Sequence, residues 1–309
     1  MHPLLKTPLV RLKDRLFPPR LCQKRFFKLL HQAGIQPGAV VMVHSSMNRI
    51  AQHVPELNAL ELVKQLQQMV GEQGTLVMPA YPFRGKQEAY LQEGKPFHSG
   101  RTPSLSGLAT EIFRRMPGTV RSLHPTHSVT AWGQHAEYLV EDHHKGATFG
   151  LHSPFCRIAR LGGLVVGIGT GYESFTLSHV SEVLHPRMRD FVNSSDAYTI
   201  DVQRQGEDSI PCEVVPLRGD LHRSAKLGED NFQRVGALRY IDRRGLRIAT
   251  ARADRLIQAG LELIEENRFL YTEEDIARWW GDKPWPSLSA EQMQIAKQAC
   301  CPEGQSDGH

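Results

Sequence analysis

An imidazole and a carboxylate stand three positions apart in the run Thr176-Leu-Ser-His179-Val-Ser-Glu182. We expect this run on a helix near residues 174–184, where residues i and i+3 share one face. A carboxylate beside one ring nitrogen fixes the tautomer of a histidine, and the other nitrogen is then free to accept a proton. The spacing therefore predicts His179 as a general base, which contributes on the order of 10²–10⁴-fold in rate, and Glu182 as its partner.

The same spacing is also typical of an exposed ion pair on a helix, which stabilises a protein by only ~0.3–0.5 kcal/mol. The neighbourhood of the pair favours catalysis. The apolar run Leu164-Val-Val-Gly-Ile168 reads as a buried strand, and a glycine-rich turn follows it directly. Open α/β sheets bind their ligands at such strand ends.

The turn itself, Gly167-Ile-Gly169-Thr-Gly171, suggests a dinucleotide site. It departs from the GxGxxG pattern in its last spacing, and no acidic residue ends a strand about 20 positions further on. An NAD-dependent oxidoreductase therefore stays open as an alternative function, beside the simpler interpretation of a tight strand exit.

Hydroxyl-bearing residues occur at two places where a chain could hold the phosphates of a cofactor. One is His44-Ser45-Ser46, at the end of an apolar strand near 39–43; the other is the segment with Thr102, Ser104 and Ser106, at the start of a helix expected over 104–116. Backbone N–H groups at such positions bind anions. Each group taken singly is also typical of a helix cap, and Ser104 is the N-cap that we expect.

Histidines gather in one part of the chain, and a metal site is one explanation. The pairs His124-x-x-His127 and His143-His144 have suitable chemistry for zinc, nickel or copper. The sequence has no HExxH motif, no cysteine near these pairs and no carboxylate at ligand spacing, so we expect no metal. Eight of the 15 histidines lie in this region: His124, His127, His135, His143, His144, His152, His179 and His185.

Strands and helices alternate along the first half of the chain. Apolar strands near 39–43 and 75–78 are separated by a helix near 56–70, and helices are also expected at 22–33 and 249–267. Fully apolar strands indicate a sheet that is covered on both faces. Alternating segments at 198–202 and 212–215 predict a small antiparallel excursion. We expect a basic lead-in over 1–21, one domain over 22–285 and a polar tail over 286–309.

Composition excludes several classes of protein. The chain has 309 residues, a net charge of +4 and 40% hydrophobic residues, which is ordinary for a globular enzyme. No segment reads as a secretory signal or a membrane span, and no aromatic-rich basic platform for nucleic acid follows the lead-in. The five cysteines are odd in number and unpaired by spacing, which indicates reduced thiols. We therefore expect a cytoplasmic protein. Its composition is compatible with a monomer or a homodimer.

Several motifs together resemble the aminoglycoside N3-acetyltransferase family, which is distinct from the GNAT acetyltransferases. They follow the order and spacing of that family from about 38 to 182, and a weaker match, Val235-Gly-Ala237 with the helix near 249–267, extends it to about 270. The motifs are Val43-His-Ser-Ser46, Gly74-Thr-Leu-Val-Met-Pro79, Thr102-Pro-Ser104, Pro117-Gly-Thr-Val-Arg-Ser122, His124-Pro-Thr-His-Ser128, Ala131-Trp-Gly133, Ser153-Pro154, Leu161-Gly-Gly163 and Thr176 through Glu182.

This resemblance implies a layered α/β/α domain, with a mostly parallel or mixed central sheet, that binds acetyl-CoA in a cleft beside the sheet. It also implies direct transfer of acetyl from acetyl-CoA to an amine. The catalytic histidine of the family corresponds to His179 and its carboxylate partner to Glu182. The CoA-contacting loop corresponds to His44, Ser45 and Ser46, and His124 lines the cleft.

The acceptor is then a small polar amine such as an amino sugar or an aminoglycoside-like compound. Tyr81 and Arg84, in the loop after the strand that ends at Pro79, are further expected acceptor contacts. Basic residues match or outnumber acidic ones from Tyr81 to Arg101, so we expect an acceptor that carries an anionic group beside its amine. A relative that binds CoA without turnover is the non-enzymatic alternative; the presence of both His179 and Glu182 argues against it.

Overall fold

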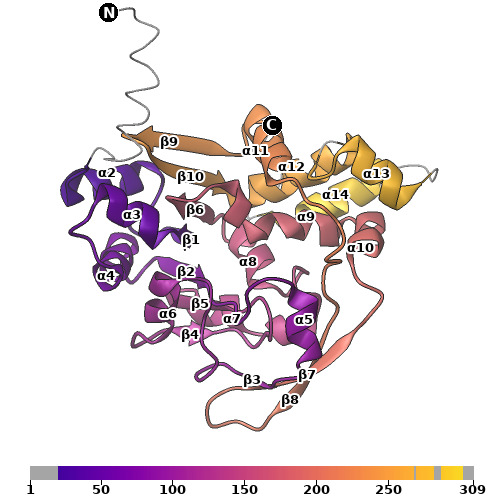
Figure 1. The fold of residues 1–309 in the computed structure, drawn as a ribbon, viewed down its shortest axis with the longest axis horizontal. Coiled ribbons are helices and arrows are strands. Elements are labelled where there is room, and N and C mark those ends of the chain that lie inside the picture. Colours follow the sequence, from indigo (N-terminus) through magenta and orange to yellow (C-terminus); the bar gives the residue numbers. More distant parts are fainter. Residues whose placement is uncertain (1–19, 268, 282–286, 302–309) are drawn as a thin grey trace, which may run out of the picture.

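A seven-stranded mixed sheet forms the centre of the molecule (Figure 1). The structure is a computed structural model that describes residues 20–267, 269–281 and 287–301. The strand order is β4-β5-β2-β1-β6-β10-β9, in which β2, β1 and β6 are parallel and the outer strands are antiparallel to their neighbours. The strands are β1 (Val40–Ser45), β2 (Thr75–Pro79), β4 (Val120–Arg121), β5 (Val129–Gly133), β6 (Leu164–Ile168), β9 (Arg239–Arg243) and β10 (Leu246–Arg252).

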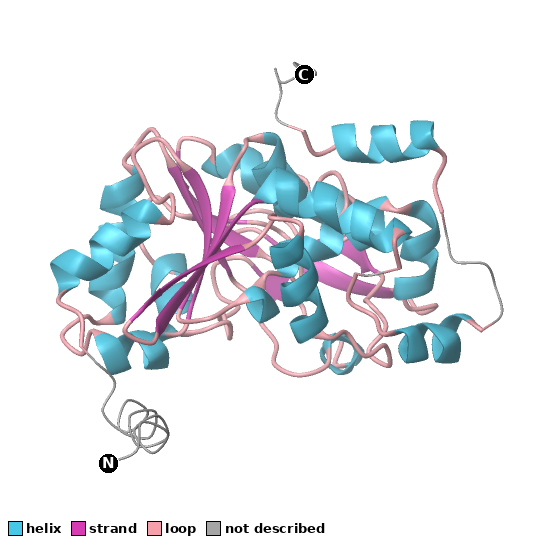
Figure 2. Ribbon diagram, turned by 90° about the horizontal axis from the view of Figure 1, so that it is seen from above, coloured by secondary structure: helices cyan, strands magenta, loops and turns pink. Residues whose placement is uncertain are grey.

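Helices cover both faces of this sheet, as Figure 2 shows from above. Successive side chains of a strand point to opposite faces, and in β1 Val41 and Val43 join one buried cluster while Val40 and Met42 join the other. The first cluster includes residues of α2 (Gln23–Gln32), α3 (Met47–His53), α4 (Ala59–Val70) and α6 (Leu108–Arg114). The second includes residues of α7 (Ala136–Val140), α8 (Pro154–Arg160), α9 (His179–Leu184), α10 (Pro186–Val192), α11 (Ala225–Arg234), α12 (Ala253–Glu265) and α14 (Ala290–Gln298). The expected layered α/β/α fold is confirmed.

A second, three-stranded sheet lies at one edge of the molecule (Figure 1). Its order is β3 (Phe97–His98), β7 (Tyr198–Gln203) and β8 (Ile210–Val214), with β7 and β8 antiparallel. The antiparallel excursion predicted from the alternating segments at 198–202 and 212–215 is therefore present. Helix α5 (Gln87–Gln92) packs beside it through Leu91.

Several helix boundaries differ from the prediction; the helix expected near 174–184, for example, begins only at His179 as α9. Helix α6 begins at Leu108, after Gly107 with φ 146°, and not at Ser104, whose N–H donates to Glu111 at 2.7 Å instead of capping the helix. Residues 249–252, expected at the start of a helix, belong to β10, where pairing with β6 outweighs the helical preference of Ala249 and Ala251.

The end of the chain also differs from the expected polar tail. Helix α14 begins with a capping box between Ser289 and Gln292 and buries Ala296. Helix α13 (Glu273–Trp280) precedes it. Most of the basic lead-in, residues 1–19, and the last segment, 302–309, lie outside the described residues. Within the described part of the chain, every helix is too short or too polar to cross a membrane.

Candidate active site

His179 and Glu182 form the contact that their spacing predicts. The chain leaves β6, passes through two short 3-10 turns (Tyr172–Ser174 and Thr176–Ser178) and enters α9 at His179. Nδ1 of His179 lies 2.6 Å from Oε2 of Glu182. The His179 side chain keeps 20% of its surface exposed, whereas Glu182 is fully buried. The pair is therefore not an ordinary surface ion pair: its carboxylate is inside the protein and one edge of its imidazole is accessible.

Two further side chains hold the Glu182 carboxylate. The Tyr271 hydroxyl donates a hydrogen bond to Oε1, and Nε of Arg223 lies 3.4 Å from the same oxygen. Burial alone would raise the pKa of Glu182, but the charges of Arg223 and His179 and the hydrogen bonds from His179 and Tyr271 lower it to about 2. An ionised carboxylate only accepts hydrogen bonds. Nδ1 of His179 therefore carries a proton, and Nε2 is the nitrogen that can accept one.

The ring of Phe149 lies between His179 and a second group of rings around His127. The Phe149 ring lies 5.2 Å from the His179 ring and 5.0 Å from the ring of His127. Tyr81 packs 4.8 Å from His127, and its hydroxyl donates to Oγ1 of Thr176 at 2.9 Å. Burial, together with the nearby imidazoles of His179 and His143, lowers the pKa of His127 to about 3. His127 is therefore a neutral neighbour of His179. In this environment of low polarity, solvent screens the interaction between His179 and Glu182 only weakly.

The strand-end residues His44, Ser45 and Ser46 lie at the carboxyl edge of the parallel strands. His44 continues the face of Val40 and Met42, and its buried ring lies 5.9 Å from that of Phe175. Burial lowers its pKa to about 4, and its Nε2 has no hydrogen-bond partner among the described residues. Ser46 caps α3, with its hydroxyl accepting from the N–H of Arg49 at 3.4 Å. Ser45 is half-buried at the end of β1.

The glycine-rich turn after β6 is closed by the protein's own groups. Gly169 has φ 69°, and a Cβ at this position would meet Cβ of Arg49 at 2.7 Å, so the turn requires glycine. The carboxylate of Glu173 accepts hydrogen bonds from the N–H of Gly171 and the hydroxyl of Thr170, each at 2.8 Å. A carboxylate thus occupies the place that a dinucleotide phosphate would need, which disfavours an NAD site here.

The hydroxyls of the 102–106 segment serve the protein's own structure. Thr102 accepts from the N–H of His98 at 2.8 Å, and Ser104 shares a hydrogen bond with Thr110 at 3.0 Å. Ser106 accepts from the N–H of Tyr81 at 3.0 Å, so this segment positions the backbone of a residue beside His127. The predicted role of these three residues in cofactor binding stays a prediction.

The remaining predicted acceptor residues are placed differently from one another. Tyr81 lies beside the His179 region, as described above. Arg84 is exposed on the loop after β2. His124 is only 1% exposed; its ring stacks on His143 at 4.4 Å, and Nδ1 accepts from the N–H of His127 at 3.2 Å. It therefore supports the wall behind His127.

Both ring nitrogens of His143, one of the clustered histidines, have partners within the protein. Nδ1 of His143 lies 3.0 Å from the Ser122 hydroxyl and Nε2 lies 3.1 Å from the carbonyl oxygen of Thr148. Burial lowers the pKa of His143 to about 3. Within residues 20–267, 269–281 and 287–301, no group of three or more His, Cys, Asp or Glu side chains is arranged to hold a metal ion.

Residues of the site line two cavities, and a third cavity shares lining residues with one of these. A hollow of about 170 Å³ is lined by His179, Thr176, Phe175 and Arg223. On the other side of Phe149 lies a cavity of about 330 Å³, which shares Asn193 and Val215 with a wider cavity of about 910 Å³.

Carboxylates outnumber cations around the widest cavity. Its charged lining residues are Glu88, Asp190, Asp196, Asp220, Lys86 and Arg218. Of the basic residues that suggested an anionic acceptor, Arg84, Lys95 and Arg101 are exposed, and Lys95 pairs with Glu93 at 2.7 Å. Lys86, the fourth basic residue of this loop, does line the cavity. The loop is therefore basic in sequence, whereas the residues that line the cavity are mostly acidic.

Sequence reasoning missed several residues of this site. Arg223 and Tyr271 lie 41 and 89 positions after Glu182 and have no pattern that links them to it. Phe149 belongs to no motif in the sequence that would indicate a role in the site. His127 belongs to the His124-Pro-Thr-His-Ser128 motif, so the motif itself was a signal for a second functional histidine.

Comparisons with known proteins agree on one family. The family model described as aminoglycoside 3-N-acetyltransferase matches residues 42–265. The aminoglycoside N(3)-acetyltransferase VII of Streptomyces paromomycinus is 32% identical over 175 residues, which are 52% of this chain and 59% of that protein. The match thus spans about three fifths of that relative's length.

Solved structures show the same fold. The aminoglycoside acetyltransferase AAC(3)-Xa has a TM-score of 0.68 at 23% identity, covering 85% of this chain and 99% of that one. The binary complex of AAC-IIIb with CoASH has a TM-score of 0.61 at 21% identity, covering 79% of this chain and 96% of that one.

Proposed function

The chain belongs to the aminoglycoside 3-N-acetyltransferase family, and from this membership we propose that it transfers the acetyl group of acetyl-CoA to an amine of an amino sugar or aminoglycoside-like acceptor. The observation that carries the proposal is the partly exposed imidazole of His179, 20% exposed, on the fully buried carboxylate of Glu182. A buried anion with three hydrogen-bonding partners has little structural purpose in an apolar core, whereas it orients and charges a general base effectively.

Nε2 of His179 accepts the proton that the amine loses as its nitrogen attacks the thioester carbonyl. The resulting imidazolium is stabilised by Glu182, whose charge is in turn balanced by Arg223. His179 then returns the proton to the departing thiolate. Phe149 and the neutral ring of His127 exclude water from one side of the base, and much of the acceleration comes from holding amine and thioester together.

The proposed place for acetyl-CoA is the carboxyl edge of β1, with its acetyl end at the hollow beside His179. His44 is neutral at physiological pH because burial lowers its pKa to about 4, and its buried Nε2 lacks a partner among the described residues. It therefore suits a neutral amide or carbonyl of the pantetheine arm. Ser45 and Ser46 offer their hydroxyl groups to the more polar part of the cofactor. The name of the AAC-IIIb complex, which contains CoASH, supports the same cofactor class.

The acceptor extends from His179 past Phe149 towards the carboxylate-lined cavity. Asp190, Asp196, Asp220 and Glu88 outnumber Lys86 and Arg218 there, so ammonium groups on the acceptor are favoured over phosphates or carboxylates. The proposed acceptor therefore carries at least one ammonium group besides the reacting amine.

The direct test is release of free CoA from acetyl-CoA, followed with a thiol reagent, on a panel of amines. Turnover with at least one amino sugar or aminoglycoside supports the proposal. A thermal shift produced by NAD but not by acetyl-CoA, with no thiol release from any amine, would instead support the oxidoreductase alternative. Binding of acetyl-CoA without turnover of any amine would identify a non-catalytic relative.

A further inference from the structure

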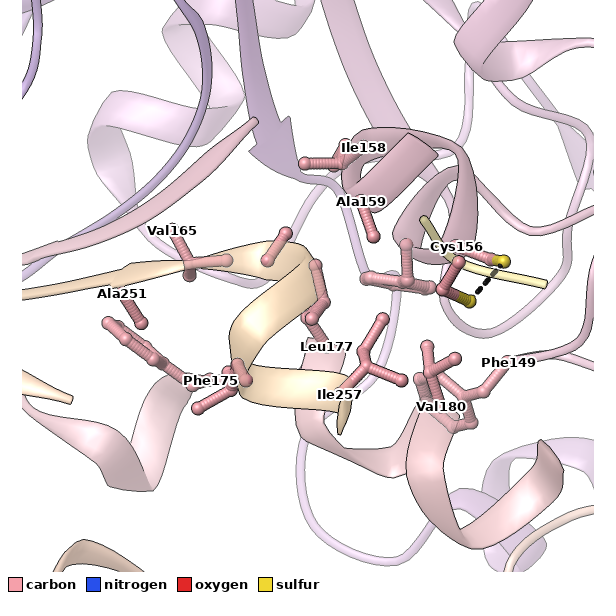
Figure 3. Packing of buried hydrophobic residues seen from close by; sticks show 14 of the residues in the cluster. Phe149, Cys156, Ile158, Ala159, Val165, Phe175, Leu177, Val180, Ala251 and Ile257 are labelled. Atoms are coloured by element: carbon pink, nitrogen blue, oxygen red, sulfur yellow. Dashed lines mark hydrogen bonds between the residues drawn. The ribbon is translucent and has the colours of Figure 1, made fainter. Parts of the chain in front are cut away.

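Two cysteines that are far apart in sequence meet in the core. Cys156 lies in α8 and Cys300 lies just after α14, 144 positions later, and both are fully buried. Their sulfur atoms are 2.7 Å apart, and the dashed line in Figure 3 marks this contact. The distance is already shorter than an ordinary contact between two thiols, and a disulfide bond of about 2.05 Å requires the atoms to approach by only about 0.7 Å.

We propose that Cys156 and Cys300 are a reversible oxidation site, where a peroxide converts the two thiols to a disulfide that fastens the C-terminal helix to the core. This inference does not depend on the proposed acetyltransferase activity. The other three cysteines lie differently: Cys22 is exposed, Cys212 is buried in the second sheet, and Cys301 is half-buried.

The chemistry balances with one peroxide. The Cys156 thiolate attacks one oxygen of hydrogen peroxide, which gives a sulfenic acid and one water after proton transfer. The Cys300 sulfur then attacks the Cys156 sulfur, so that the S–S bond forms, the S–O bond breaks and a second water leaves. Two electrons pass from the two sulfurs to the peroxide.

The surroundings favour Cys156 as the first nucleophile. A hydrogen bond from Cys300 lowers the pKa of Cys156 against the effect of burial, and the guanidinium groups of Arg160 and Arg157 act in the same direction. Arg160 also fixes the chain at the partner cysteine, because its Nε donates to the carbonyl oxygen of Ala299 at 2.8 Å.

A cavity lies beside the residue that precedes Cys300. A space of about 460 Å³ is bounded by Leu151, Leu184, Ile295 and Ala296 on α14, and Ala299 just after it. Ala299 directly precedes Cys300. Local opening of the last turn of α14 then exposes the sulfurs, as terminal helices open more readily than a core.

Polar contacts with α12 and its end also hold the α14 region, and the bond would add to them. Lys297 pairs with Glu262 at 2.6 Å, and the N–H of Leu288 donates to Glu265 at 2.9 Å. Ala296 is buried, but Ile295 remains 60% exposed. A cross-link that closes a long loop restricts the unfolded chain most.

The test uses the full-length protein, reduced and then treated with hydrogen peroxide. Peptide mapping without reductant should show Cys156 joined to Cys300, and the thermal midpoint should rise on the order of 5–10 °C and fall again after reduction. Mapping in the Cys301→Ser variant separates the two adjacent cysteines. The Cys22→Ser variant is a matched control that should keep both effects, and Cys300→Ser should lose both.

Three results would overturn the inference. One is a bond between Cys300 and Cys301, and another is an intermolecular bond through Cys22. The third is a native protein whose Cys156 and Cys300 stay reduced under peroxide although the denatured protein forms the bond. The Cys300→Ala variant, compared in its reduced state with the wild type, shows whether substitution alone has loosened α14.

Discussion

At the residue scale, the chemistry rests on one imidazole and the groups behind it. Glu182 is ionised at any pH near neutral, and it holds Nδ1 of His179 at 2.6 Å. Arg223 and Tyr271 hold the other oxygen of the same carboxylate. The base and the groups that hold it are therefore four side chains. Only His179 and Glu182 were identifiable from their spacing in sequence.

Replacement of Glu182 by Gln should change how the rate depends on pH. The Glu182 anion favours the imidazolium form of His179, so its loss keeps the base unprotonated to lower pH. We expect the acidic limb of kcat/KM to move down by about one pH unit or more and kcat to fall about tenfold. A pH series on wild type and Glu182→Gln measures both effects.

The matched control is Glu265→Gln, because Glu265 pairs with His185 at 2.9 Å in another histidine–carboxylate contact. This variant should leave the acidic limb in place. If Glu182→Gln also leaves the limb unmoved, the two side chains of the proposed catalytic pair do not communicate.

Tyr271 should act as a positioning residue for Glu182. Tyr271→Phe removes one donor from the buried carboxylate, which corresponds to roughly a threefold to tenfold lower kcat with little change in KM. Steady-state kinetics at saturating acetyl-CoA check this, with Tyr198→Phe in the second sheet as the control. Equal losses in both variants, or a change confined to KM, would remove Tyr271 from the catalytic network.

At the scale of elements, the site lies where parallel strands end. Strands β1, β2 and β6 were predictable because burial on both faces makes them continuous apolar runs. Helices α3 and α14 were not predictable, because the caps and tertiary contacts of a short helix decide whether it forms, and its periodicity does not. The same limit explains β10. Ala249 and Ala251 have a helical preference in the sequence, but in the structure they pair with β6 as part of a strand.

Ser45, at the end of β1, should lie against acetyl-CoA. Ser45→Asp places a negative charge beside the phosphates of the cofactor, so we expect CoA binding to weaken by at least tenfold with the fold intact. Calorimetric titration of CoA measures the affinity. Ser289→Ala is the comparison variant, since Ser289 caps α14 and not the end of β1, and its loss should cost about 1 kcal/mol of stability. Undiminished CoA affinity in Ser45→Asp would place the cofactor elsewhere.

At the scale of the whole molecule, the fold brings distant segments to one base. His179 follows β6, Phe149 comes from the loop before α8, and Tyr271 comes from the segment after α12. The layered fold and its two sheets followed from patterns in the sequence and from the family resemblance. The charge of the cavities did not, because the basic residues from Tyr81 to Arg101 mostly face solvent while the carboxylates of three later segments line the widest cavity.

The acceptor preference should follow the charge of that cavity. We expect kcat/KM for gentamicin- or kanamycin-type amines to exceed that for an amino sugar phosphate, and Asp196→Asn to reduce the difference. Parallel assays at fixed ionic strength measure both, with the exposed Glu72→Gln as the charge-matched control. A preference for the anionic acceptor would restore the expectation drawn from the loop sequence.

The measurement that tests the central claim most directly is kcat of His179→Ala at saturating acetyl-CoA and amine, together with its Kd for CoA. If Nε2 of His179 takes the proton from the attacking amine, kcat should fall by roughly 100-fold or more while the Kd for CoA changes by less than about twofold. A variant that keeps most of its turnover would contradict the account.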